Sequence, residues 1–354
     1  MKKGYLVLQD GQVFEGVRFG AAADAVGELV FHTGTGGFLE IMTDPANAGQ
    51  IVMQTYPLIG NYGVIREDFE GACCLKGYVV RECCDAPSNF RTDMDLDTYL
   101  KEQGVPGLAG VDTRELTRII RENGAMNAMI CDEIPADLAA VKTYAIADAV
   151  TAVTCAETAV YPAEGEAAYK VTLVDYGAKR SMIRALQAMG CAVTVVNADT
   201  AAEEILAAEP DGVVLSAGPG DPAENEARIA EVKKLLGQVP VMGVGLGHQM
   251  AALAAGAKTV KLKYGHHGVN QAVRDLKGQR TYTTSQNHIY AVDPATIVEG
   301  TMSFANVNDG SCEGIDYPAW NAFTVQFDPV LCTGTRDAGL LLKRFADMMK
   351  GGAK

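Results

Sequence analysis

In the second half of the chain, the hydrophobic positions follow two patterns in turn, one typical of strands and one typical of helices. Short apolar runs predict buried strands at 171–175, 192–196, 212–216 and 241–244. Between them, apolar residues three or four positions apart predict helices at 179–189, 201–208, 224–236 and 247–255. Strands that alternate with helices over short links indicate an α/β fold with a mainly parallel sheet flanked by helices. Such a sheet binds ligands at the carboxyl ends of its strands.

The first half shows the alternation that is typical of strands. Segments at 5–8 and 12–14 flank the turn Asp10-Gly11, which predicts a β-hairpin. Further strands are expected at 29–31, 51–53 and 78–80. Residues 112–121 instead have helical spacing, an acidic start and a glycine beyond their end, so they predict a helix. We therefore expect a strand-rich mixed domain.

The segment between these halves is rich in alanine, threonine and glutamate, with a proline and a glycine near its end. A chain of 354 residues is long enough for two hydrophobic cores. We expect an N-terminal domain at 1–135, a linker region at 136–168 and a C-terminal domain at 169–354.

Composition narrows the range of functions. The net charge of −14 argues against binding to nucleic-acid phosphates, and no apolar run approaches the roughly 18 residues of a membrane span. The apolar stretch at the start is too short for a signal peptide. We therefore expect a cytoplasmic protein whose partners are proteins or small molecules.

The nine cysteines are an odd number spread over a long chain, which indicates reduced thiols rather than a disulfide framework. Cys73 and Cys74 are neighbours, as are Cys83 and Cys84, and neighbours on a strand point to opposite faces. Neither pair easily converges on one ion, so we expect buried thiols and no metal site.

Two glycine-rich loops follow strands at the expected ligand-binding edge. In the first, at 215–222, Gly218 and Gly220 let the backbone approach a ligand and present N–H groups to an oxyanion. The second, at 240–249, is a strand that turns sharply into a helix, as in a nucleophile elbow. Its turn residue is Gly245, which has no side chain to attack a substrate. Neither loop has the spacing of a nucleotide-phosphate site.

The motifs in these loops resemble those of class I, triad-type glutamine amidotransferases. Gly218-Pro219-Gly220-Asp221-Pro222 and Gly247-His248-Gln249 carry this likeness. More narrowly, the chain resembles carbamoyl-phosphate synthetase small subunits at 27–31, 43–45, 49–52, 55–63, 88–91, 112–114, 256–261, 265–268 and 286–288. The resemblance therefore covers nearly the whole chain.

This resemblance implies a subunit that docks on a large subunit, in good part through its N-terminal half. The large subunit is expected to use ATP and Mg²⁺ to make carbamoyl phosphate for pyrimidine and arginine synthesis. No cofactor is expected in this chain itself.

The small subunits of that family hydrolyse glutamine with a cysteine, a histidine and a glutamate. By the resemblance, Gly245 stands at the cysteine position, Asp328 at the histidine position and Val330 at the glutamate position. We therefore expect all three triad positions to be chemically vacant and glutamine hydrolysis to be lost.

The glutamine pocket that the resemblance implies also departs from the family. Ala46 stands for a serine, Ala217 for an asparagine and Ile289 for a glycine. The positions that keep the family pattern are Gly218, Gly220, Leu246, Gln249, Asn287 and Tyr290. Ala46 lacks the serine hydroxyl, and the Ile289 side chain fills space that a glycine would leave open. We therefore expect glutamine or a related small molecule to bind weakly if at all.

No other residue clearly replaces the triad. The five histidines are expected to have packing or hydrogen-bonding roles, because none stands at the triad position, and they are His32, His248, His266, His267 and His288. Asp328 could accept a proton but has no nucleophile to activate. Cys332 is close to the vacant positions but lacks the elbow geometry.

The leading hypothesis is a non-hydrolysing small subunit that supports a reaction fed by ammonia from solution. One alternative is a free-standing regulatory protein that senses a small molecule in the remnant pocket. The other is a glutaminase that acts by a different route.

Overall fold

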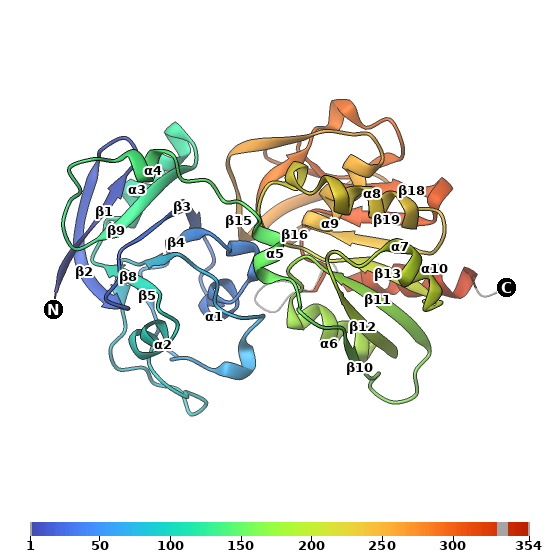
Figure 1. Cartoon of the computed structure of the whole chain (residues 1–354), viewed down its shortest axis with the longest axis horizontal. Coiled ribbons are helices and arrows are strands. Elements are labelled where there is room, and N and C mark those ends of the chain that lie inside the picture. The colour runs from blue at the N-terminus through green and yellow to red at the C-terminus, as the bar shows by residue number, and fades with distance from the viewer. Residues whose placement is uncertain (1, 331–338, 353–354) are drawn as a thin grey trace. The chain divides into compact units, whose positions relative to one another are not determined.

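The computed structural model describes residues 2–330 and 339–352. The chain folds into two units, one made of Met1–Ala147 with Lys263–Gly268 and the other of Asp148–Leu262 with Val269–Lys354 (Figure 1). None of the helices in the described residues has the length and apolar character that a membrane span requires.

The first unit is built on a closed β-barrel. Its strands, in spatial order, are β1 (Lys3–Leu8), β2 (Val13–Gly20), β8 (Pro106–Ala109), β6 (Gly77–Val79), β4 (Gln50–Gln54), β3 (Ala25–His32) and β9 (Met126–Cys131). The expected hairpin is present, because β1 pairs with β2 in antiparallel register. The barrel closes where β1 pairs with β9. The prediction of a strand-rich N-terminal domain is confirmed.

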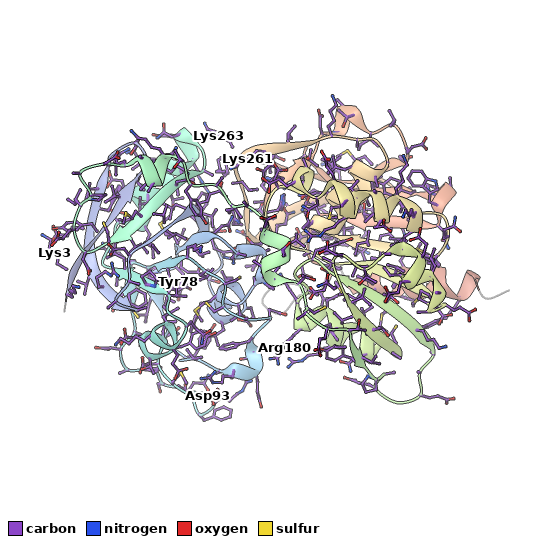
Figure 2. All side chains as sticks on the ribbon, in the orientation of Figure 1. Lys3, Tyr78, Asp93, Arg180, Lys261 and Lys263 are labelled. Carbon is purple, nitrogen blue, oxygen red and sulfur yellow. The ribbon has the colours of Figure 1, made fainter. Side chains whose placement is uncertain are left out.

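Helices pack apolar side chains against these strands. The remaining elements of the unit are α1 (Phe38–Met42), β5 (Leu58–Ile59), β7 (Glu82–Cys83), α2 (Leu96–Glu102), α3 (Thr113–Asn123) and α4 (Ala139–Lys142). Helix α3 begins where the Asp112 side chain accepts N–H bonds from Arg114 and Glu115. Tyr78, labelled in Figure 2, is fully buried in the cluster that α2 joins through Leu96.

The second unit contains a ten-stranded sheet. In spatial order its strands are β10 (Ala159–Tyr161), β12 (Cys191–Asn197), β11 (Tyr169–Asp175), β13 (Gly212–Leu215), β14 (Val241–Val244), β19 (Ala322–Val325), β18 (Cys312–Tyr317), β16 (Thr281–Val292), β15 (Thr259–Asp275) and β17 (Thr301–Asn306). The five strands from β12 to β19 in this order are parallel. The predicted α/β class is confirmed, and antiparallel strands extend the sheet on both sides of the parallel part.

Helices cover both faces of the parallel part of this sheet. They are α5 (Ala149–Val153), α6 (Arg180–Ala188), α7 (Ala202–Ala207), α8 (Glu226–Leu235), α9 (Leu246–Ala254) and α10 (Leu340–Gly352). Val213 and Leu215 belong to the apolar cluster of α7, α8 and α9, whereas Val214 belongs to the cluster of α6 and α10. Because successive side chains are buried on opposite faces of the sheet, the sequence of each strand is a continuous apolar run.

Helix α9 begins very close to the end of β13. The amide of Gly247 donates to the Ser216 carbonyl over 2.9 Å, and a Cβ atom at Gly247 would lie 2.3 Å from the Leu215 carbonyl oxygen. That oxygen belongs to the backbone, so it cannot move aside as a flexible side chain could. Position 247 therefore has no room for a side chain.

We expect Gly247→Ala to lower the free energy of unfolding by about 1–3 kcal/mol, although alanine is ordinarily the better helix former. Denaturant unfolding measures this change. Gly36→Ala is the control, because a Cβ atom at Gly36 meets nothing within 4 Å. A Gly247→Ala protein as stable as the control would contradict the close approach.

Candidate functional site

Gly245 occupies the turn that joins β14 to α9. Its backbone angles are φ 54° and ψ −111°, a conformation that side chains strongly disfavour and glycine adopts freely. Its amide donates to the Val325 carbonyl over 2.9 Å, and its carbonyl accepts from the Gln249 amide over 3.2 Å. The turn thus has the strand-to-helix form of a nucleophile elbow, without a nucleophile.

The first glycine-rich loop packs directly against this turn. A Cβ atom at Gly245 would lie 3.0 Å from the Ala217 Cβ atom, and one at Gly218 would lie 2.2 Å from the Tyr176 carbonyl oxygen. Gly220 has a φ of 87°, which also favours glycine. The sequence predicted both loops at one sheet edge, and the structure brings their backbones into contact.

Asp328 forms an ion pair inside the second unit. The Lys179 Nζ donates to its Oδ2 over 3.0 Å, and the two side chains are only 17% and 16% exposed. The other carboxylate oxygen accepts the Val330 amide over 2.8 Å. The carboxylate is therefore engaged by a cation and by the backbone.

Val330 supplies no group that can orient a base. Its partly buried side chain packs against the cluster that contains Phe327. An isopropyl group can neither accept a hydrogen bond nor hold a charge. A proton acceptor at position 328 would gain no carboxylate partner from this residue.

The Gln249 side chain is used internally. It is 3% exposed, and its Nε2 donates to the Tyr290 carbonyl over 2.6 Å and to the Gln326 Oε1 over 2.9 Å. These two bonds use both amide protons. Only the Gln249 carbonyl oxygen is left to contact a ligand.

The other predicted pocket positions are placed as follows. Leu246 starts α9 and is 3% exposed, and Ile289 on β16 is 7% exposed. Asn287 and Tyr290 lie beside Ile289 on the same strand and are half-buried. Ala46 belongs to the first unit, where its amide donates to the Asp44 Oδ1 over 3.0 Å. Buried Ile289 fills space that a glycine would leave open.

His248 is fully buried beside this turn. Its Nδ1 lies 2.7 Å from the Thr324 hydroxyl oxygen, and burial lowers its pKa to about 3. The imidazole is therefore neutral at physiological pH and held by a hydrogen bond. His288 likewise places its Nδ1 2.7 Å from the Tyr290 carbonyl oxygen. Both residues have the hydrogen-bonding roles expected from the sequence.

Burial also makes most described thiols unreactive. It raises the pKa to about 11 for Cys73, Cys131 and Cys191, and to about 12 for Cys74, Cys83 and Cys312. Such thiols are protonated at neutral pH and are poor nucleophiles and poor metal ligands. Cys332 lies outside the described residues.

Lys179 is the residue that sequence reasoning missed. It was read only as the start of a helix, although it follows β11 at the same carboxyl edge as the two loops. A lysine just beyond the end of a buried strand is only a weak indication of a site residue, because most lysines in such positions are solvated. Its partner is 149 positions away in the chain.

Comparison with known proteins gives matches over both units. The model for the carbamoyl-phosphate synthase small chain, CPSase domain, matches residues 6–130, and that for class-I glutamine amidotransferases matches residues 172–348. A carbamoyl phosphate synthase small chain from Oceanobacillus iheyensis is 43% identical, covering 99% of this chain and 97% of that protein.

Two further relatives have the same description. The protein from Bacillus cereus is 43% identical over 98% of this chain and 96% of its own length. The protein from Listeria monocytogenes is 42% identical over 99% of this chain and 98% of its own length. The likeness therefore extends over nearly the full length of each protein.

We expect the Lys179–Asp328 pair to stabilise the second unit. In a double-mutant cycle with Lys179→Met and Asp328→Asn, the coupling free energy should be about 1–3 kcal/mol, because both groups are largely shielded from water. Denaturant unfolding of the four proteins measures it.

The exposed pair Lys343–Asp347, with side chains 72% and 49% exposed, is the matched control. Its coupling should be below about 0.5 kcal/mol. Equal coupling in the two pairs would show that the buried pair adds nothing beyond a surface contact.

Proposed function

This chain belongs to the carbamoyl-phosphate synthase small-chain family, and we propose that it is a small subunit that has lost glutamine hydrolysis. The observation that carries the proposal is the glycine at the elbow. Gly245 holds the backbone angles of the turn but offers no atom that could attack the glutamine amide. A thioester pathway needs that nucleophile first.

The surroundings of the elbow support the same proposal. At the triad histidine position, Asp328 is paired with Lys179 instead of being free to exchange a proton with a thiol. Val330 provides no orienting carboxylate, and nearby His248 is neutral and bonded to Thr324. The site would therefore need several simultaneous changes to act as a glutaminase.

The proposed partner is a carbamoyl-phosphate synthase large subunit. The relatives named above are described as small chains, a description that implies a separate large chain. ATP and Mg²⁺ would bind to the large subunit, and ammonia would enter from solution. The product would serve pyrimidine and arginine synthesis in the cytoplasm.

We expect the purified chain to bind a large subunit and to support carbamoyl phosphate formation from ammonium chloride but not from glutamine. The glutamine-dependent rate should be roughly 10⁴-fold or more below that of an active small chain with the same large subunit. Product assays with each nitrogen source measure this. Rates comparable to the active control would refute the loss, and failure to bind any large subunit would favour a free-standing regulatory protein.

Repair of the site should require several substitutions together. Gly245→Cys alone should stay near background, because without an imidazole the thiol keeps a pKa of about 8.5 and is mostly protonated. The new Cβ atom would also lie 3.0 Å from the Ala217 Cβ atom in a strained turn. Adding Asp328→His and Val330→Glu should recover some activity, since triad members act as a unit.

Two pocket changes complete the series. Ile289→Gly and Ala46→Ser should improve the apparent affinity for glutamine by restoring space and a hydroxyl. Glutamate release by each variant, with and without a large subunit, is the measurement. Substantial turnover by Gly245→Cys alone would mean that another residue already acts as the base.

A further inference from the structure

An open groove of about 1210 Å³ lies beside helix α3 of the first unit. All of its lining residues fall between positions 33 and 122, so the groove belongs to that unit alone. One wall is a side of α3, and the other comes from the segments that follow β3, β4 and β6. Pockets for small molecules usually measure roughly 300–1,000 Å³ and enclose their ligand. This groove is therefore better suited to an extended segment of a protein chain.

Arginine side chains gather in this groove. Four of the seven arginines before residue 148 line it. Arg114, Arg118 and Arg121 are four and three positions apart on α3, so they share one face of the helix over a length of about 10 Å. The opposite face of α3 is the apolar one that is buried in the core. Arg81, which follows β6, adds a fourth cation from outside the helix.

Three of these arginines have no acidic partner within the protein. The guanidinium carbon of Arg121 lies 5.5 Å from the centre of the Phe31 ring, and the Arg81 Nη1 donates to the Gly110 carbonyl over 3.4 Å. These two contacts hold the side chains but do not neutralise their charge. Among residues 2–330 and 339–352, neither they nor Arg114 form an ion pair.

The acidic residues of the lining offset these cations only in part. The Glu122 carboxylate pairs with Arg118 over 3.1 Å. The Asp112 Oδ1 accepts the amides of Arg114 and Glu115 over 3.1 and 3.0 Å, which caps the start of α3. Together with Glu115, this leaves two carboxylates beside three arginines that have no ion-pair partner. The groove therefore has a positive excess on a chain whose net charge is −14.

We infer that this groove docks an acidic segment of the large subunit. Arginine binds carboxylates through paired N–H donors, and arginine clusters recognise acidic motifs in many proteins. Alternate side chains of an extended segment are about 7 Å apart on one face, so two acidic residues of such a segment fit the length of the arginine face on α3. The negative charge of the whole chain disfavours a nucleic-acid phosphate backbone as the occupant. The inference rests on the proposed function, which names the large subunit as the partner.

Isothermal titration of the full chain with a carbamoyl-phosphate synthase large subunit, at low and high sodium chloride, tests the groove. Arg81→Glu and Arg114→Glu each reverse one cation, one from each wall, and each should raise the Kd roughly tenfold. The double variant should raise it roughly 100-fold and should respond less to salt than the unchanged chain does. Arg114→Lys keeps the charge but loses the paired donors, so it should raise the Kd only about threefold.

Lys142→Glu is the matched control, because it reverses an exposed helical cation of the same unit that does not line the groove. It should bind like the unchanged chain. Circular dichroism and unfolding midpoints establish that each variant folds. Groove variants that bind the large subunit as tightly as Lys142→Glu would overturn the inference and leave the proposed partner standing. If the unchanged chain binds no large subunit, the proposed partner is itself wrong and the inference fails with it.

Discussion

The turn at Gly245 is the constraint around which the second unit is arranged. The chain must leave a parallel strand and begin a helix within one residue, Gly245, at φ 54° and ψ −111°. The turn is held by a bond to β19 through Val325, and the helix behind it fits because Gly247 allows contact with β13. Glycine satisfies these requirements more easily than cysteine would. Gly245 therefore holds this turn without the strain that a side chain would bring.

Buried polar side chains beside this turn need hydrogen-bond partners. A carboxylate that is five-sixths buried needs partners, and Asp328 has both a lysine and a backbone amide. The Gln249 side-chain amide likewise donates hydrogen bonds to the Tyr290 carbonyl and to the Gln326 Oε1. Several polar side chains beside the turn are thus engaged by internal bonds. Substitution of Asp328 or Gln249 would break these bonds.

The two faces of the sheet explain why this region can change while the fold persists. Residues of β13 alternate between two apolar clusters, and each cluster is covered by its own helices. The triad and loop positions lie beyond the ends of these strands, so substitutions there remove few core atoms.

The sequence by itself determined the local elements and the residue type at the strand-to-helix turn. Apolar runs and helical spacing are properties of neighbouring residues, so they predicted the βα alternation, the elbow at Gly245 and the absence of a thiol there. Only the tertiary structure decided that Lys179 pairs with Asp328 and that Gln249 bonds inward. These facts depend on side chains that are far apart in the chain. Their distances are set by sheet order, register and bulges, and a linear pattern of residues does not encode these directly.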